Sequence, residues 1–443
     1  MSISILLPTQ LVLAQSESPD LPVYIVQSGD SINLIAIKFN VSSQDIIDAN
    51  NITDANLLSI GDQLVIPGIE GVSGVLTTNA VMIGESPDSI ARVHQIPIET
   101  LYRLNQITSP SQFFIGSNVI LVESPESSLR TQILSKGENV LEASIINHLS
   151  TWESILSNQT SSPWDLLPSE TVVFKTSDKE NQVNEIEFLG LPLSQGYTSE
   201  LNINTLSTPL EASIGLMNLN FFSNGPVQSS LFGIPAMQEP GLYPFHLEYT
   251  NNAGQDLVID QLILIQEGFY PQDPPLYVEA STLDEAITKP EDDLLFSTTA
   301  PFTNEKYWTG VFNYPVDEPI CIKSSYGNRR SYNDEPYNRF HTGLDFGVCA
   351  NLNIYAPADG KVVFIDSLTI RGNATIIDHG LGVYSGFWHQ SEILVEEGQY
   401  VKAGDLIGVI GTTGRSTGPH LHWELIVNGV QVNPLQWLET TYP

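Results

Sequence analysis

The two motifs His341-Thr-Gly-Leu-Asp345 and His420-Leu-His422 decide the fold of the C-terminal part of the chain. Histidine is the commonest metal ligand among side chains, and a catalytic zinc takes three protein ligands and keeps one position open. The run 423–427 that follows reads as a β-strand, so His420 and His422 point to the same face. One of them can bind a metal while the other faces whatever the metal holds. Together the two motifs predict a metal site.

Histidines concentrate around these motifs. Five of the eight in the chain lie in this region: His341, His379, His389, His420 and His422. Any one of them alone would more often be a structural histidine than a functional one. His341, His389, His420 and His422 match one motif pattern together, and four such matches indicate a functional site. His379 stands in Ile-Ile-Asp-His-Gly at the end of a predicted strand, and we expect it to mark a turn.

The region resembles the lysostaphin-like zinc endopeptidases, peptidase family M23, which cut peptide cross-links in bacterial cell walls. The resemblance extends from about Ser324 to Trp437 and includes four further runs: Ser325-Tyr-Gly-Asn-Arg329, Ala356-Pro-Ala-Asp-Gly360, Gly404-Asp-Leu-Ile-Gly408 and Thr413-Gly-Arg-Ser-Thr-Gly-Pro419. It implies an antiparallel β domain with one Zn²⁺ bound by His341, Asp345 and His422. His389 and His420 are then the two catalytic histidines that do not bind the metal.

The resemblance also points to residues around the metal. The family usually reads Tyr-x-His-Leu where this chain reads Phe387-Trp-His-Gln, so Phe387 would keep a ring in the substrate cleft without a hydroxyl. Arg329 is expected to shape the cleft, or to pair with Asp345 or a substrate carboxylate; a structural salt bridge is the alternative. Asp378 and Glu424 are candidates for orienting a ligand histidine.

The chemistry implied is metal-assisted hydrolysis of an amide. Zinc polarises the carbonyl and lowers the pKa of a bound water to about 7. A neighbouring histidine moves the proton, and another stabilises the oxyanion. We assign His389 as the base and His420 as the stabilising group, although the sequence does not separate the two roles.

The N-terminal part of the chain contains internal repeats. Residues 23–67 resemble the LysM module, a small β-α-α-β fold that binds N-acetylglucosamine chains. A shift of 55 residues superposes Gly29 on Gly84 and Asn50 on Asn105, and a shift of 108 sends Asn50 to Asn158. We predict three modules, the third degenerate; the alternative for the second and third is that they are spacers without a ligand. The resemblance implies sugar contacts at these positions of the first module: Gly29, Asp30, Ser31, Ile32, Leu58 and Ile60.

Between the repeats and the metal motifs, polar and apolar residues alternate with turn clusters between them, as in an antiparallel sandwich. We predict an immunoglobulin-like spacer and a Pro-rich acidic linker. The fold class is therefore multidomain, α+β and all-β, with these boundaries: 1–15 possible secretory signal remnant, 22–68, 76–123 and 129–176 LysM modules, 184–270 β-sandwich, 271–310 linker, and 311–443 peptidase domain.

Charge limits the partners. The net charge is −34, of which residues from Val311 onward carry −6, from eight basic and fourteen acidic side chains, and the first 310 carry −28. Binding of nucleic-acid phosphates needs basic surface, so we exclude nucleic acid as a partner. No run beyond the apolar N-terminus is long enough to cross a bilayer.

The two cysteines, Cys321 and Cys349, both lie in the predicted peptidase domain. In an extracytoplasmic protein they could form a disulfide, and two buried thiols are the alternative. The apolar N-terminus, with Val12 and Ala14 as in a signal-peptidase site, favours export to the cell wall or beyond.

We predict a zinc-dependent endopeptidase that cleaves cross-links or stem peptides of peptidoglycan and is anchored to glycan by its repeats. The first alternative is a non-enzymatic peptidoglycan-binding regulator, which would be expected to lack metal ligands. The second, a sugar-cleaving muramidase, would need a domain with paired catalytic carboxylates, and none follows the repeats.

Overall fold

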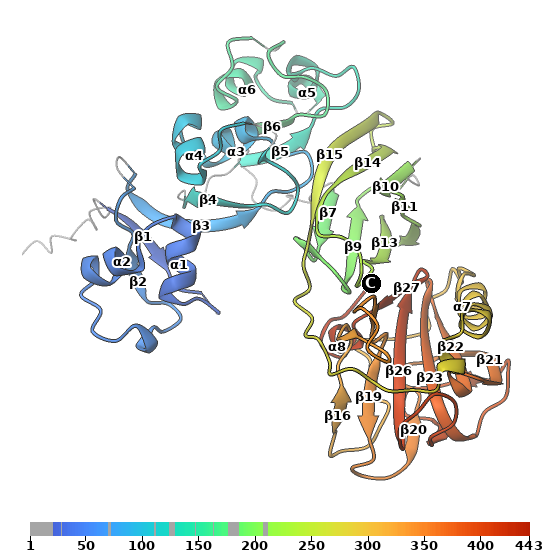
Figure 1. Cartoon of the computed structure of the whole chain (residues 1–443). Helices are drawn as coiled ribbons and strands as arrows, with labels where there is room; N and C mark the ends of the chain where they lie inside the picture. Colours follow the sequence, from blue (N-terminus) through green and yellow to red (C-terminus); the bar gives the residue numbers. More distant parts are fainter. Residues whose placement is uncertain are drawn as a thin grey trace, which may run out of the picture. The chain divides into compact units, whose positions relative to one another are not determined.

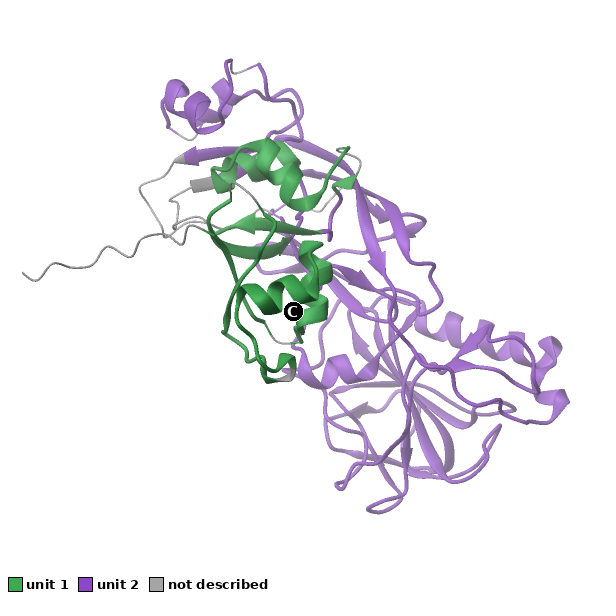
Figure 2. Ribbon diagram, turned by 60° about the vertical axis from the view of Figure 1, so that its left-hand side comes forward, with its two compact units in different colours: residues 1–79, 86–113, 118–129 green, residues 80–85, 114–117, 130–443 purple. Residues whose placement is uncertain are grey.

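The computed structural model describes residues 21–443 except 28, 70–71, 110–111, 124–128, 147, 163, 176–185 and 207–210 (Figure 1). The predicted signal remnant at 1–15 lies outside the described residues. Contacts divide the chain into two compact units (Figure 2). The first comprises Met1–Asn79, Ser86–Phe113 and Asn118–Leu129; the second comprises Ala80–Glu85, Phe114–Ser117 and Arg130–Pro443. No helix within the described ranges combines the length and apolar character that a membrane span requires.

The first unit is built on one four-stranded sheet with the order β2-β1-β3-β4. Its elements are β1 Pro22–Ile25, α1 Ile32–Phe39, α2 Ser43–Ala49, the 3₁₀ turn Ala55–Leu57, β2 Gln63–Val65, β3 Gly74–Ala80, α3 Pro87–His94, α4 Ile98–Asn105 and β4 Asn118–Val122. Helix α1 begins after Ser31, whose hydroxyl accepts a hydrogen bond from the N–H of Leu34, and it buries Ile35 and Phe39. β1 and β3 pair in parallel, so two successive repeats share one sheet.

An asparagine in each repeat connects the second helix to the last strand. Its side chain bonds both the N–H and the C=O of the residue fifteen positions later, at 2.6–2.9 Å: Asn50 with Val65, Asn105 with Ile120, and Asn158 with Val173. The third repeat consists of β5 Leu129–Ile133, α5 Val140–Ile146, α6 Thr151–Ser157 and β6 Thr171–Lys175. Because the same bonds recur, the third repeat has the same local fold.

In the second unit, two β-sheets enclose one apolar core. Their orders are β11-β10-β14-β15-β8 and β12-β13-β9-β7. The strands are β7 Ile186–Leu189, β8 Leu193–Ser194, β9 Thr198–Ile203, β10 Glu211–Ile214, β11 Met217–Asn218, β12 Phe222–Asn224, β13 Val227–Gly233, β14 Gly241–Thr250 and β15 Asp256–Gln266. Much of the alternating sequence lies in these strands, whereas the alternating run 215–221 contains only the two-residue strand β11; the immunoglobulin-like assignment stays a prediction.

Loops of the repeats contact strand β15 within this unit. In the third repeat, the N–H of Lys136 donates to the carbonyl of Asp256 at 2.9 Å, and the Ser169 hydroxyl donates to the carbonyl of Val258. In the segment Ala80–Glu85, the N–H of Gly84 donates to the side-chain oxygen of Gln261 at 2.7 Å. These loops lie at the positions that correspond to the predicted sugar loops of the first repeat.

The C-terminal part of this unit is a ten-stranded sheet with the main order β16-β19-β26-β23-β22-β21-β24. Its strands are β16 Ile322–Ser324, β19 Leu344–Gly347, β20 Asn353–Tyr355, β21 Gly360–Leu368, β22 Gly372–Gly380, β23 Val383–Ile393, β24 Tyr400–Val401, β25 Leu406–Ile410, β26 His420–Val427 and β27 Val430–Val432. The short pair β17 Arg329–Arg330 and β18 Arg339–Phe340 stands apart, and α8 Pro434–Glu439 follows the sheet. Trp423 and Trp437 are fully buried in its core.

Residues 271–310, predicted as a linker, contain ordered elements. A 3₁₀ turn spans Ala280–Leu283, and helix α7 spans Glu285–Thr299 and begins at the N-cap Asp284. The carboxylate of Glu291 on α7 accepts hydrogen bonds from the N–H groups of Ile370 and Arg371, which fixes the helix to the turn between β21 and β22. The segment predicted as a linker thus contains a helix, and this helix includes Pro290.

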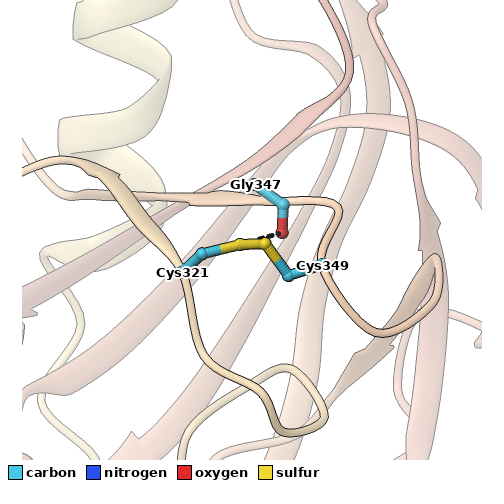
Figure 3. Close-up of a disulfide and its surroundings, with 3 residues drawn as sticks. All are labelled: Cys321, Gly347 and Cys349. Atoms are coloured by element: carbon cyan, nitrogen blue, oxygen red, sulfur yellow. Dashed lines mark hydrogen bonds between the residues drawn. A yellow bond between two sulfur atoms is a disulfide. The ribbon is translucent and has the colours of Figure 1, made fainter.

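A disulfide joins Cys321 to Cys349, with the two Cα atoms 6.2 Å apart (Figure 3). Cys321 directly precedes the edge strand β16, and Cys349 follows β19, the strand that carries Asp345. The N–H of Gly347 also donates to the carbonyl of Cys321 at 2.9 Å. The bridge therefore holds the edge strand against the strand that carries a predicted metal ligand.

His379 is a buried core residue at the end of β22. One ring nitrogen lies 2.8 Å from the carbonyl of Asp359 and the other 2.8 Å from the hydroxyl of Ser385. Complete burial lowers the pKa of His379 to about 4, so the ring is neutral in the folded protein. The structure gives it two local partners and no contact with the predicted metal ligands.

Replacing both Cys321 and Cys349 by serine should lower the free energy of unfolding by ~3–4 kcal/mol, because the bridge closes a loop of 28 residues. Denaturant titrations of oxidised wild type and the double variant measure the difference. Reductant should destabilise the wild type and leave the variant unchanged; equal stability of the two oxidised proteins would contradict this role.

Lowering the pH from 7 to 5 should destabilise the wild type by ~2 kcal/mol more than His379→Gln. The unfolded histidine binds a proton near its ordinary pKa of 6.5, whereas the folded one does so only near 4, so stability is lost as the pH falls below 6.5. Denaturant unfolding of both proteins at the two pH values tests this. Parallel profiles would show that His379 is not the group responsible.

Candidate metal centre and substrate groove

The register of two neighbouring strands brings the metal motifs together. β19 pairs with β26 so that Asp345 stands opposite His422 and Leu344 opposite Trp423. His341 lies just before β19 and reaches the same point. At Gly343 an added Cβ would lie 2.2 Å from the carbonyl oxygen of Trp423, so only glycine permits this close approach of the two segments.

The side chains of His341, Asp345 and His422 converge on one point. Nε2 of His341 lies 2.9 Å from Oδ1 of Asp345 and 3.0 Å from Nδ1 of His422, and that Nδ1 lies 2.8 Å from the same Oδ1. All three residues are largely buried. These three atoms form the group that could hold a metal ion in the described part of the chain.

Hydrogen bonds on the far side of each ring set the inward nitrogens as acceptors. Nδ1 of His341 lies 2.8 Å from the carbonyl of Ser325 and donates its proton there. Nε2 of His422 lies 3.2 Å from Oε1 of Glu424 and donates to that carboxylate. Each inward nitrogen therefore presents a lone pair beside the Asp345 carboxylate. Three acceptors this close repel one another unless a cation lies between them, so the donor set fits a bound Zn²⁺.

The charges of this cluster favour a cation. Burial alone would lower the pKa of His422, but the carboxylates of Asp345 and Glu424 raise it to about 9, so without a metal ion Nδ1 carries a proton and the lone pair becomes available when a metal ion displaces that proton. Burial opposes the ionised form of Glu424 as well, yet His422 and Arg371 lower its pKa to about 2. Two carboxylates thus stay ionised around His422, and they attract a positive charge to this point.

His389 and His420 lie beside the three predicted ligands. Nε2 of His420 is 3.7 Å from Oδ1 of Asp345, and the rings of His389 and His420 have their centroids 4.8 Å apart. Nδ1 of His389 lies 2.8 Å from the carbonyl of Thr413, and Nδ1 of His420 lies 2.8 Å from that of Gly418. Both rings thus use Nδ1 for structure and leave Nε2 for chemistry.

A strained bulge positions His389. Thr375 pairs with Phe387 and Asn373 with Gln390, so β23 has one extra residue at this place. His389 has φ of 64°, in the left-handed region that non-glycine residues seldom adopt. Burial, with His422 and His420 close by, lowers the pKa of His389 to about 3, which keeps the ring neutral.

Two residues expected in the cleft lie elsewhere, and a neighbour replaces one of them. Phe387 is fully buried in the core and does not reach the groove. Arg329 donates to the carbonyl of Ala236 at 2.8 Å and so binds the preceding domain. Arg330, the next residue, lines the groove with a guanidinium nitrogen 3.9 Å from Asp345. Adjacent strand residues point to opposite faces, and no local pattern in the sequence indicates which arginine faces inward.

The metal cluster opens into a groove of about 710 Å³. One wall comes from the peptidase sheet and includes Trp388 and Ile426. The other comes from the segment predicted as a linker, through Leu276, Leu295 and Phe296. The supposed linker is therefore part of the site. Asp378 lies apart from the groove, because its carboxylate accepts hydrogen bonds from Thr303 and the N–H of Gly380.

The predicted sugar positions of the first repeat divide into structural and exposed residues. Asp30 accepts hydrogen bonds from the Tyr24 hydroxyl and the N–H of Gln27, at 2.7 and 2.8 Å. Ile32 belongs to the core, and Ser31 caps helix α1. Leu58 packs partly against the core. Gly29 and Ile60 are exposed, as is the neighbouring Leu57.

Comparison with known proteins identifies two kinds of domain. A model of peptidase family M23 matches residues 339–434, and a LysM domain model matches residues 24–67 and 81–121. The first match contains the three predicted metal ligands and both further histidines. The second corresponds to the first two repeats.

Several relatives are named as peptidoglycan endopeptidases. Peptidoglycan DD-endopeptidase ShyA of Vibrio cholerae is 41% identical over 123 residues, 28% of this chain and 29% of that protein. Peptidoglycan DD-endopeptidase ShyC of the same organism is 27% identical over 318 residues, 66% of this chain and 69% of that protein. DD-carboxypeptidase/endopeptidase Mpg of Neisseria meningitidis is 43% identical over 97 residues, 22% of each. The matches to ShyA and Mpg thus span less than a third of those proteins.

Among solved structures, a putative peptidase M23 from Pseudomonas aeruginosa aligns with a TM-score of 0.42 and 25% identity, covering 57% of this chain and 97% of that one. Zinc, the cofactor of M23 peptidases, agrees with the His–Asp–His group that the structure brings together. The C-terminal domain of the chain belongs to peptidase family M23, and its N-terminal part carries two LysM domains.

Proposed function

We propose that the protein is a zinc-dependent endopeptidase that cleaves peptides of peptidoglycan. The observation that carries this proposal is the convergence of His341, Asp345 and His422 beside two further histidines in the lining of one groove. The relatives named peptidoglycan DD-endopeptidases support the choice of substrate. A non-enzymatic regulator is the weaker candidate, because such a protein does not need a complete set of metal ligands with two further histidines beside them.

His341, Asp345 and His422 would hold the zinc. When bound there, zinc supplies Lewis-acid polarisation of a peptide carbonyl and lowers the pKa of a water molecule. Nε2 of His389, kept neutral by burial, accepts the proton of the attacking water and returns it to the leaving amine. Nε2 of His420 donates toward the oxyanion from the protonated ring, because Nδ1 already uses its hydrogen on the carbonyl of Gly418. The carbonyl of Thr413 holds His389 in the tautomer that a base requires, and the carbonyl of Gly418 orients the ring of His420.

The first LysM module is the proposed glycan-binding site. Leu57 and Ile60 are 74% and 72% exposed in the loop before β2, next to Gly61. Exposed apolar side chains beside a glycine turn suit contact with the faces of neutral sugars, and the chain's acidic surface gives no alternative through charge. A wall substrate and the disulfide both support a location outside the cytoplasm.

Alanine at His341 or His422, or asparagine at Asp345, should abolish zinc binding and activity together, whereas His389→Ala and His420→Ala should keep zinc and lose ~10²-fold or more in kcat. Elemental analysis and hydrolysis of a cross-linked wall peptide separate the two groups. Full zinc occupancy in the ligand variants would overturn the ligand assignment, and near-normal turnover in either histidine variant would remove that residue from the mechanism.

Ile60→Asp should weaken binding to insoluble peptidoglycan while leaving hydrolysis of a small soluble peptide unchanged. The new carboxylate would replace an apolar side chain on the proposed sugar-binding surface. Covering this charge with a bound sugar would remove it from water, which costs free energy. Leu216→Asp is the matched control, because Leu216 is fully exposed in the sandwich. Equal losses in both variants would show that the effect comes from added charge and not from this loop.

A further inference from the structure

Several arginines line the groove, although the protein as a whole is acidic. The chain has eight arginines and nine lysines. Four of the arginines line the groove, and none of the lysines that the structure describes does: Arg330, Arg339, Arg371 and Arg415. Arg339 comes two residues before His341, and Arg415 comes five before His420, so both side chains start within a few residues of the catalytic cluster.

Two of these arginines are already neutralised. Nε of Arg330 lies 3.1 Å from Asp273, and its Nη2 lies 3.9 Å from Asp345. Arg371 pairs with Glu291 and Asp292 at 3.6 and 2.9 Å. These two arginines therefore have structural partners. Arg330 lies beside the predicted metal ligand Asp345, and Arg371 pairs with two carboxylates of helix α7.

Arg339 and Arg415 form what we call the arginine pair. Their guanidinium carbons lie 5.9 and 4.9 Å from the centre of the Tyr332 ring, which also lines the groove. Arg415 donates one hydrogen bond to the carbonyl of Thr282 at 2.9 Å. In the described ranges of the chain, neither arginine forms an ion pair with a carboxylate.

The immediate surroundings of the arginine pair hold no unengaged carboxylate among the described residues. Arg339 stands directly opposite Arg330 in the β17–β18 ladder, so the position across the strand pair is another arginine. The acidic side chains that line the groove are already engaged: Asp292 with Arg371, Asp293 with Lys289, Asp345 with its histidines, and Glu424 with His422. Arg339 and Arg415 are therefore suited to bind an anion that does not belong to the protein.

We propose that Arg339 and Arg415 bind a free carboxylate of the substrate peptide close to the scissile bond. The proposal rests on the proposed peptidase function and narrows its substrate to peptides that carry an acidic group there. A planar guanidinium matches a carboxylate through paired hydrogen bonds, which gives orientation as well as affinity. A bridge made only of glycine offers neutral amides and would leave both arginines without a partner.

The test uses two synthetic cross-linked wall peptides that differ only in one carboxyl group beside the scissile bond, free in one and amidated in the other. The zinc-loaded full chain should cleave the free acid with kcat/KM about tenfold or more above the amide. Arg339→Gln and Arg415→Gln should lose most of this difference with unchanged zinc content. Lys402→Gln removes one charge from an exposed position of the same domain and should keep the preference.

Binding separates this proposal from the peptidase function itself. Calorimetry with zinc-loaded His389→Ala should show tighter binding of the free acid than of the amide by a similar factor, and adding Arg339→Gln should abolish the difference. If neither peptide is cleaved but this binding difference appears, the peptidase proposal fails and the carboxylate site stands. Equal rates and equal affinities for both peptides, or a preference that survives in both arginine variants, would overturn the carboxylate site.

Discussion

Three electron-rich atoms, Nε2 of His341, Oδ1 of Asp345 and Nδ1 of His422, meet within 3.0 Å of one another, and much of the domain exists to hold them there. Three lone pairs this close would repel one another, so the geometry favours a cation between them, either a metal ion or the proton that the raised pKa of His422 retains. The strand register, the glycine at 343 and the outer bonds to Ser325 and Glu424 each remove one way for these atoms to separate. The site is preorganised, because the geometry of the sheet holds these three atoms close together.

The chemistry of the site could be read from the sequence where it depends on local pattern. The spacing of His420 and His422 fixes their common face, and the recurrence of one asparagine at intervals of 55 and 53 residues marks the repeats, because Asn50, Asn105 and Asn158 make the same bonds. What escaped prediction depends on distant partners. Arg329 and Arg330 differ only in which side of a short strand they occupy, and that follows from the pairing of β17 with β18. Likewise α7 becomes a groove wall only because Glu291 finds two N–H groups about eighty residues further on.

The repeats show how one fold can serve two purposes in one chain. All three have the asparagine link, so their internal stability has a common source. In the second compact unit, however, the loops around Gly84, Lys136 and Ser169 bond to strand β15, whereas Leu57 and Ile60 of the first repeat remain open to solvent. A loop that gives its N–H and hydroxyl groups to a strand has fewer of them left for a sugar.

The disulfide has a consequence for solubility. β16 is the outermost strand beside β19, and an unpaired strand edge invites other chains to extend the sheet. Three residues of β16, with Lys323 at their centre, cover the edge of the strand that carries Asp345, and the bond from Cys321 to Cys349 prevents so short a strand from detaching. Reduction would uncover a β-edge next to the metal site, so an unoxidised chain would be exposed to edge-to-edge aggregation before it could act on any substrate.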